Sequence, residues 1–452
     1  MGADDRAKLM DSLKANRRSA RGRAASTAAR PAAAAPKRKV YDFKELPQVK
    51  QLQMHRAAAD MMGIENPFFR PHDGLAAGTS VINGGNYDNF ASYNYLGLNG
   101  HPKVNQTAKA YLDQFGTSVS ASRIVAGERP FHGELEAALA RIHGVESSIV
   151  MVSGHATNVT TIGHMMHKGD LVLTDAFVHN SIAEGVRLSG ATRMNFPHDD
   201  LDGLEKMLSD HRHKFDKVLI VVEGLYSMDG DFPDLRRIVK LKQAYDAWLM
   251  VDEAHSIGVL GKTGKGIAEH FGIDPNEVEM WMGTLSKTFS SCGGYIAGSK
   301  VLCDYLKVSA PGFVFSVGLS AALAGAAIAS AELLEQEPDR VERLQKNGAL
   351  FLKLAKEAGL NTGPSAGYAV VPVIVGDSAG AATLSNRLLA KGINALPIIF
   401  PAVPEKSARI RFFITSEHTE EQIARAVETT AAELDAMRAD GTAVDRLIKA
   451  AR

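Results

Sequence analysis

Cysteine is scarce in this sequence. Among its 452 residues only Cys292 and Cys303 carry a thiol. Two cysteines cannot form the network of disulfides that stabilises small secreted domains. The scarcity therefore indicates a protein that folds in a reducing compartment, and we predict a cytoplasmic location.

An excess of charge and long apolar runs are missing as well. The 51 Lys and Arg residues balance the 51 Asp and Glu residues, so the formal net charge is zero. Without a basic excess, nothing predicts nucleic acid as the main partner. No apolar run reaches the roughly 18 residues that a membrane-spanning helix needs, so we expect no transmembrane segment.

The first forty residues differ in composition from the rest of the chain. Arginine and lysine are interspersed with alanine there, and the apolar core of a secretion signal is missing. We expect residues 1–40 to be a basic disordered tail. An organellar transit peptide, which Asp4 and Asp5 disfavour, and a tail that contacts anionic lipid or an acidic carrier protein are the alternatives.

The length of the remaining chain predicts more than one domain. We expect a helix and a connecting segment at 41–100, a large domain at 101–330 and a small C-terminal αβ domain at 331–452. Within the large domain, short apolar runs alternate with helical patterns. The apolar runs lie at 148–152, 171–174, 218–223, 249–251 and 279–282.

This alternation predicts an α/β fold with a mostly parallel sheet that is covered by helices on both faces. Ligands of such sheets bind beyond the carboxyl ends of the strands. The residues that follow each apolar run are therefore the candidates for a functional site.

Lys287 follows the last of these runs, in a loop of hydroxyls and glycines. A lysine amine forms a Schiff base with an aldehyde when it is partly neutral. The nearby Thr284, Ser286 and Thr288 can donate hydrogen bonds to a phosphate group. The loop thus favours pyridoxal phosphate (PLP) as cofactor, with an ordinary surface lysine as the alternative.

Asp252 follows another apolar run, and His255 comes three residues later. PLP needs a carboxylate against its pyridine nitrogen, because the protonated ring is the electron sink. Asp252 can supply that carboxylate, and His255 can reach the ring hydroxyl. The alternatives are a capping role for Asp252 and a metal site formed with Glu253, which lacks further clustered ligands.

Three more strand ends carry polar residues. His179 can stack on a flat cofactor, or it is a structural histidine. Ser227 can donate to the ring hydroxyl, or it belongs to a simple turn. A third segment joins a strand to a helix, whose first N–H groups suit a phosphate, although many such turns bind nothing. Its residues are Ser153, Gly154, His155 and Ala156.

From about residue 89 to its end, the chain resembles the α-oxoamine synthase family, in which these motifs occur in the same order. Matching blocks are Asn-Tyr-Leu-Gly at 94–97, and the segments at 122–136, 223–230, 252–255 and around Lys287. The resemblance implies a PLP-dependent transferase of fold type I. The reaction it implies is the decarboxylative condensation of serine, alanine or glycine with an acyl thioester of CoA or acyl carrier protein.

The resemblance also implies roles for individual residues. Lys287 would hold PLP and act as general base, with Asp252 at the ring nitrogen and His179 on the ring face. Arg411 and Asn94 would bind the carboxylate of the amino acid. Ser316 would reach the phosphate of the neighbouring subunit across a homodimer interface.

The subgroup is less well defined. A serine palmitoyltransferase-like activity is our first expectation, although the segment at 400–404 lacks an arginine at its start. The alternatives are 2-amino-3-ketobutyrate CoA ligase and 8-amino-7-oxononanoate synthase activity. An ordinary aminotransferase is disfavoured by the 252–255 block, and a non-catalytic subunit of the same fold is disfavoured by the presence of Lys287.

Overall fold

The computed structural model describes residues 42–440, so the basic tail predicted at 1–40 lies outside the described residues. The chain divides into two compact units, Met1–Ala58 and Ala59–Arg452. The described part of the first unit holds η1 (Phe43–Glu45) and most of α2 (Pro47–Met61). The second unit contains all the sheets of the described residues and every residue of the candidate site.

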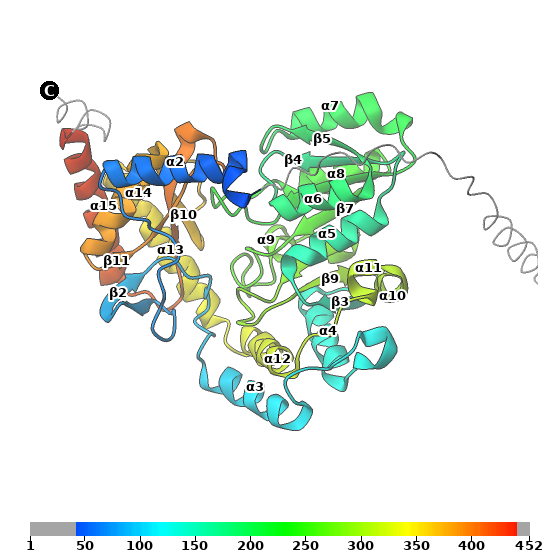
Figure 1. The fold of residues 1–452 in the computed structure, drawn as a ribbon. Helices are drawn as coiled ribbons and strands as arrows, with labels where there is room; N and C mark the ends of the chain where they lie inside the picture. The colour runs from blue at the N-terminus through cyan, green and yellow to red at the C-terminus, as the bar shows by residue number, and fades with distance from the viewer. Residues whose placement is uncertain (1–41, 441–452) are drawn as a thin grey trace, which may run out of the picture. The chain divides into compact units, whose positions relative to one another are not determined.

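A seven-stranded sheet forms the centre of the second unit, with the strand order β3-β9-β8-β7-β6-β4-β5 (Figure 1). The strands β5, β4, β6, β7 and β8 run parallel, whereas β9 is antiparallel to both of its neighbours, β3 and β8. This confirms the predicted α/β fold with a mostly parallel sheet. The strands are β3 (Ser147–Met151), β4 (Leu171–Asp175), β5 (Thr192–Phe196), β6 (Val218–Glu223), β7 (Trp248–Asp252), β8 (Met280–Thr284) and β9 (Gly294–Gly298).

Alternate residues of the central strands enter two separate cores. In β4, Leu171 and Leu173 pack on one face with residues of α7 and α8, whereas Val172 packs on the other face with residues of α5, α6 and α10. Both faces of the sheet are therefore covered, which explains why the strands read as continuous apolar runs. The helices are α5 (Gly154–Met165), α6 (Asn180–Ser189), α7 (Leu201–His211), α8 (Leu235–Ala244) and α10 (Lys300–Ser309).

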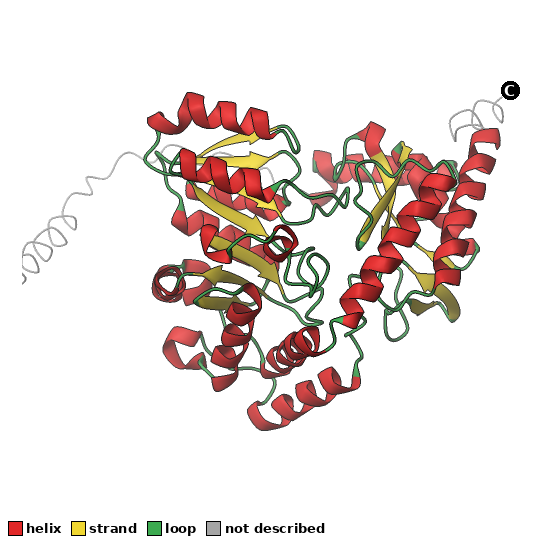
Figure 2. Cartoon of the chain, turned by 180° about the vertical axis from the view of Figure 1, so that it is seen from behind, coloured by secondary structure: helices red, strands yellow, loops and turns green. Residues whose placement is uncertain are grey.

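The C-terminal part contains a smaller antiparallel sheet with the order β10-β13-β12 (Figure 2). A second three-stranded sheet, β1-β2-β11, pairs two strands that precede the large sheet in the chain with one strand of the C-terminal part. Helices α13, α14 and α15 accompany the smaller sheet. The elements are β1 (Thr79–Ile82), β2 (Gly85–Asn89), β10 (Val370–Gly376), β11 (Ile393–Asn394), β12 (Leu396–Ile398), β13 (Ala408–Phe413), α13 (Asp339–Glu357), α14 (Ser378–Ala390) and α15 (Glu420–Asp440).

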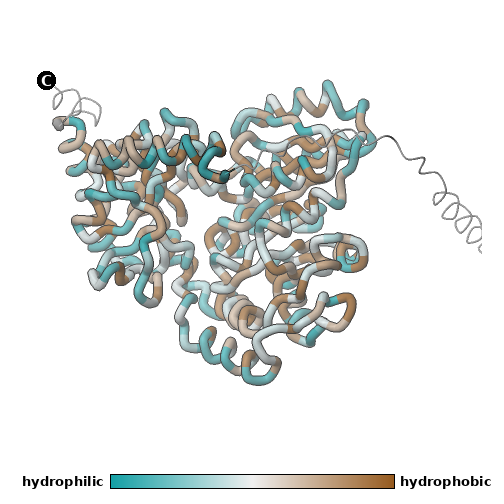
Figure 3. The backbone as a smooth tube through the Cα atoms, viewed as in Figure 1, coloured by the Kyte–Doolittle hydropathy of each residue, from teal (hydrophilic) through white to brown (hydrophobic). Residues whose placement is uncertain are grey.

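Helix α12 (Ala321–Gln336) is the apolar, alanine-rich helix, and it packs against α3 (Pro102–Phe115) and α4 (Pro130–His143). In Figure 3, α12 is largely apolar, whereas α3 is hydrophilic over much of its length. Within residues 42–440, no helix is both long and apolar enough to cross a membrane.

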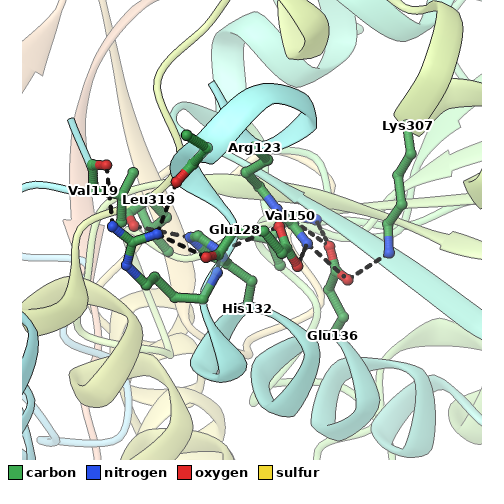
Figure 4. A network of polar contacts seen from close by, with 10 residues as sticks. Val119, Arg123, Glu128, His132, Glu136, Val150, Lys307 and Leu319 are labelled. Carbon is green, nitrogen blue, oxygen red and sulfur yellow. Dashed lines mark hydrogen bonds and ion pairs between the residues drawn. The ribbon is translucent and has the colours of Figure 1, made fainter. Parts of the chain in front are cut away.

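A buried ionic network joins α4 to its surroundings (Figure 4). The carboxylate of Glu136 accepts hydrogen bonds from Arg123 at 2.5 Å, from Lys307 at 2.7 Å and from the main-chain N–H of Val150 at 3.0 Å. Arg123 belongs to η2 (Arg123–Gly127), and its guanidinium lies 5.2 Å from the ring centroid of Phe313. The network therefore fixes the η2 loop and the segment after α10 to the edge of the large sheet.

A second ionic cluster lies beyond the strand ends. The Nδ1 atom of His198 lies 2.9 Å from the carboxylate of Asp175, and its Nε2 atom lies 2.9 Å from that of Asp231. The ring of Phe177 stacks on His198 at 4.4 Å. Burial disfavours a charged ring, but the two carboxylates outweigh it and raise the pKa of His198 to about 10. His198 thereby connects the loop after β4 to the loop after β6.

Replacement of His198 with Gln should lower the free energy of unfolding, because two carboxylates lose their cation. We expect a loss of about 2–4 kcal/mol at pH 6. The raised pKa means that the contribution is complete below about pH 6.5 and is lost as the pH rises towards about 10. Urea unfolding at several pH values should therefore show a difference between the variant and the wild type that shrinks with rising pH. His213→Gln, at an exposed histidine, is the control, and a constant difference between pH 6 and pH 9.5 would contradict the assignment.

Candidate active site

A cavity of about 330 Å³ lies at the carboxyl ends of the parallel strands. Most of the site residues expected from the sequence line it, although they come from segments far apart in the chain. They are Ser153, Gly154, His155, His179, Ser227, Asp252, His255, Thr284, Ser286, Lys287 and Arg411.

Lys287 lies in a short loop that returns directly into the same sheet. The loop leaves β8, is closed by hydrogen bonds from Leu285 N to Gly293 O and from Ser291 N to Leu285 O, both 2.9 Å, and enters β9. Burial lowers the pKa of Lys287 to about 8, against the opposing charges of Asp252 and Glu223. A larger fraction of this amine is therefore neutral near pH 7 than of an exposed lysine, as a Schiff-base lysine requires.

Asp252 ends β7, and its carboxylate is held by two donors. Asn158 Nδ2 donates to Oδ2 at 2.9 Å, and the N–H of Ala254 donates to Oδ1 at 3.0 Å. The side chain is buried but lines the cavity, so it presents a fixed carboxylate to a ligand there. Such a carboxylate is what a protonated pyridine nitrogen requires.

His179 is the N-cap residue of α6, and a chain of hydrogen bonds links it to Asp252. Its Nδ1 atom lies 2.7 Å from Ser181 Oγ, and Asn158 Nδ2 lies 2.9 Å from the same hydroxyl. Burial lowers the pKa of His179, although the charge of Asp252 opposes this. A neutral, oriented ring suits the predicted stacking role, which remains a prediction.

His255 is bonded to a tyrosine. Its Nδ1 atom lies 2.7 Å from the hydroxyl of Tyr95, in the interior of the protein. Burial holds the pKa of His255 well below its ordinary value, and the charge of Lys287 adds to this effect. The imidazole is therefore neutral, and its edge borders the cavity.

The candidate phosphate site lies at the start of α5. Ser153 is the N-cap residue, and its Oγ accepts a hydrogen bond from the N–H of Ala156 at 3.3 Å. A side chain at Gly154 would come within 2.8 Å of Thr284 Oγ1, so only glycine fits this approach. The first N–H groups of α5 and the Thr284 hydroxyl thus face the same end of the cavity, which suits an anion.

Thr288 does not take part in this site, contrary to our expectation. Its buried hydroxyl donates to the carbonyl oxygen of Ile257 at 2.7 Å. Glu253 is likewise engaged elsewhere, because its carboxylate accepts from the N–H of Ile267 at 3.1 Å and from the Ser256 hydroxyl. The carboxylate of Glu253 is therefore not available to bind a metal ion together with Asp252 and His255, as the metal-site alternative required.

Arg411 enters the cavity from β13 of the smaller sheet. Its Nη1 donates to the carbonyl oxygen of Ser227 at 2.8 Å, and its guanidinium lies 4.6 Å from the ring centroid of Phe413. The buried Nε has no partner among the described residues. Arg409 pairs instead with Asp229 at 2.5 Å, so the second arginine of the motif is the one that lines the cavity.

Asn94 and Ser316 do not line this cavity. The side chain of Asn94 accepts from the N–H of Asn99 at 3.0 Å, so it is engaged with the main chain, and its neighbour Tyr93 lines the cavity instead. Ser316 lines a separate surface hollow beside Phe315. The predicted roles of Asn94 in substrate binding and of Ser316 in a neighbouring subunit remain predictions.

Seven further residues line the cavity beyond the expected ones, and the contacts of four of them, Tyr93, Met228, Asn158 and Glu223, bear on the site. The Tyr93 ring centroid lies 5.6 Å from Lys287 Nζ, and Met228 Sδ lies 3.6 Å from Arg411. Asn158 orients Asp252, and Glu223 ends β6. Glu223 could have been predicted to line the site because it ends an apolar run, whereas the sequence carries no such signal for Asn158 and Met228, which the surrounding fold brings to the cavity. Together the residues fit PLP, because they supply a partly neutral amine, a fixed carboxylate and a helix N-terminus.

A model of the aminotransferase class I and II family matches residues 86–429. The 8-amino-7-oxononanoate synthase 1 of Bacillus velezensis is 40% identical over 352 residues, which cover 78% of this chain and 89% of that relative. Among solved structures, the serine palmitoyltransferase of Sphingomonas wittichii gives a TM-score of 0.83 at 29% identity and covers 88% of this chain and 99% of its own. A second such structure, of SPT with a PLP internal aldimine, has the same TM-score of 0.83 at 28% identity and the same coverage, 88% and 99%.

These similarities confirm the predicted fold type and the PLP cofactor. The family model and the curated relative both cover most of the chain, and the residues matched by the family model include the strand ends that form the cavity. The chain therefore belongs to the aminotransferase class I and II family and, within it, to the α-oxoamine synthases, which are PLP-dependent acyltransferases.

Proposed function

We propose that the protein condenses alanine with the thioester of a dicarboxylic acyl chain and releases CO₂, in an 8-amino-7-oxononanoate synthase-like reaction. The similarity to curated synthases of that name favours this reaction over our first expectation, a serine palmitoyltransferase-like one. In such a product the carbon that bears the amine also bears a methyl group, which is the side chain of alanine. The observation that carries the proposal is the cavity in which Lys287, Asp252 and Arg411 meet.

When bound, PLP supplies the electron sink that stabilises negative charge at the α-carbon of the amino acid. The lowered pKa of Lys287 suits an amine that accepts the α-proton near neutral pH. Asn158 keeps the carboxylate of Asp252 in one orientation, so the acid is ready to hold a proton on the ring nitrogen. Asp252 is buried, which limits the access of water to its carboxylate.

Arg411 is the group we propose for the carboxylate of the amino acid. Its Nη1 already donates to the carbonyl oxygen of Ser227. Its Nε has no hydrogen-bond partner among the described residues, so this N–H still requires an acceptor. A buried guanidinium beside a cavity pairs well with a carboxylate, because the two planar groups can share parallel hydrogen bonds. The ring of Phe413 packs against the guanidinium and limits its movement.

We further propose that the protein works as a homodimer. Apolar side chains near Ser316 are unusually exposed, with Phe315 86% and Val125 79% accessible. A second copy is the occupant that we assign to this surface, because the segment around Ser316 resembles one that family members place at the partner's phosphate. Association would cover the apolar side chains.

A substrate panel tests the proposed reaction. Purified protein with PLP would receive glycine, alanine, serine or threonine together with short, long and dicarboxylic acyl thioesters, and CO₂ release would be measured. We expect the fastest release with alanine and a dicarboxylic thioester. Lys287→Ala should reduce the rate by at least about 10²-fold, because the base is lost. Lys262→Ala, at an exposed lysine, is the control, and preference for serine with a long monocarboxylic chain would contradict the proposal.

Arg411→Lys tests the carboxylate site. The lysine keeps the charge but loses the planar fork, so the KM for the amino acid should rise by about 10–100-fold. Because the lost contact forms on binding, kcat should change less than KM. Lys406→Ala, at an exposed residue of the same segment, should leave both constants unchanged. An unchanged KM in Arg411→Lys would refute the assignment.

Phe315→Asp tests the dimer. A carboxylate on the exposed apolar surface would have to be buried in the interface, which is costly. The variant should therefore sediment as a smaller species than the wild type at equal concentration. Phe43→Asp, at another exposed phenylalanine, should leave the sedimentation unchanged. A wild-type protein that sediments as a monomer at high concentration would rule the dimer out.

A further inference from the structure

Two carboxyl groups end neighbouring strands at the cavity. Glu223 ends β6 and Asp252 ends β7, and the parallel ladder places them directly opposite each other. Glu223 is 3% and Asp252 is 4% exposed, and both line the cavity. Neither forms an ion pair with any residue between 42 and 440. Nothing in the reaction described above uses Glu223.

The hydrogen-bond donors around the pair are divided unequally. Asp252 accepts one good hydrogen bond on each oxygen, from Asn158 at 2.9 Å and from Ala254 at 3.0 Å. The N–H groups of Ser227 and His179 lie near Glu223, but only Ser227, at 3.3 Å, has hydrogen-bond geometry. Glu223 Oε1 is buried without a partner among the described residues. The donors therefore favour charge on Asp252 over charge on Glu223.

Two neighbouring buried carboxyl groups do not both ionise readily, because each charge disfavours the other. Burial, followed by the charge of Asp252, raises the pKa of Glu223 well above its ordinary range. The charge of Lys287 opposes this shift of the Glu223 pKa, but more weakly. A charge on Glu223 would in turn raise the pKa values of Arg411 and Tyr226, which lie near it. The proton of the pair accordingly belongs on Glu223.

We propose that Glu223 keeps its proton in the folded protein and faces the cavity as a neutral hydrogen-bond donor, so that Asp252 alone carries the negative charge of the pair. A neutral acid can donate to an oxygen of a bound carboxylate, whereas a second carboxylate would repel it. Two other buried side-chain atoms of cavity residues lack a partner among the described residues, Asn158 Oδ1 and Arg411 Nε, and Arg411 Nε is a donor that serves the same class of ligand. The single negative charge also leaves the amine of Lys287 easier to deprotonate.

Two isosteric variants test this assignment in protein without cofactor or substrate. Each of Glu223→Gln and Asp252→Asn replaces an acid by an amide of nearly the same shape. If the proposal is right, only Asp252→Asn removes a negative charge. The readout is the pH dependence with which the Lys287 amine reacts with an acylating reagent, with Lys287→Ala as background. The midpoint of this pH dependence should lie at about pH 8 in the wild type.

Glu223→Gln should leave this midpoint in place, because a neutral group replaces a neutral group. Asp252→Asn should lower it by about one pH unit or more, because the nearby negative charge is lost. An equal decrease in both variants would show that Glu223 is ionised and would overturn the proposal. The result is independent of the proposed reaction, because no substrate turnover is measured.

Infrared spectroscopy of the wild-type protein gives a second test that does not depend on the folding of a variant. With ¹³C-labelled glutamate, a protonated carboxyl group shows a C=O band apart from the carboxylate bands. Buried Glu253, whose pKa burial raises to about 8, contributes to this band at neutral pH and loses its share above that value. We expect a residual band to persist at pH 9 and to be missing from Glu223→Gln. The absence of a protonated glutamate band at pH 9 in the wild type, or an unchanged band in Glu223→Gln, would refute the proposal.

Discussion

The arrangement of the site depends on the side-chain amide of Asn158. Its Nδ2 donates both to the carboxylate of Asp252 and to the hydroxyl of Ser181, each at 2.9 Å, and Ser181 in turn bonds His179. One buried amide therefore connects β7 to α5 and α6, which begin at the two loops that approach the cavity from one side. The acid, the histidine and the helix start that we propose for the phosphate are thus held in fixed positions relative to one another.

A second unit is contributed by the smaller sheet. Arg409 and Arg411 lie two residues apart on β13, so their side chains project from the same face of the strand. Arg409 pairs with Asp229 and Arg411 donates to the carbonyl oxygen of Ser227, so the loop after β6 is anchored at two positions. The first arginine secures the contact between the two sheets, and the second is left with a free N–H for a ligand.

Much of the architecture could be predicted because buried parallel strands are continuous apolar runs. The five predicted runs match β3, β4, β6, β7 and β8, and the polar residues at their ends meet in one cavity. Two strands of the seven-stranded sheet were missed. β5 is an edge strand with one fully buried residue, Phe196, and β9 begins and ends with glycine, so neither carries a long apolar run.

The differences between the expected and the observed lining of the cavity have another origin. Thr288 and Thr284 are both hydroxyl residues beside Lys287, and the sequence does not reveal that the loop turns Thr288 towards Ile257. Asn94 and Tyr93 are adjacent, and which of them faces the cavity is decided by the hydrogen bonds of Asn94 to Asn99. Glu223 was overlooked because its protonation depends on Asp252, a residue of another strand.

The short loop that carries Lys287 has a consequence for how such an enzyme can change. The loop is closed on itself and lies between two paired strands, β8 and β9, while β7 with Asp252 adjoins β8. The amine and the acid that we propose for the chemistry are therefore built into one sheet, whereas the arginine that we propose for binding the amino acid comes from another. Substitutions in the smaller sheet can alter the choice of amino acid without disturbing the reacting groups, so selectivity and reactivity can evolve separately on this scaffold.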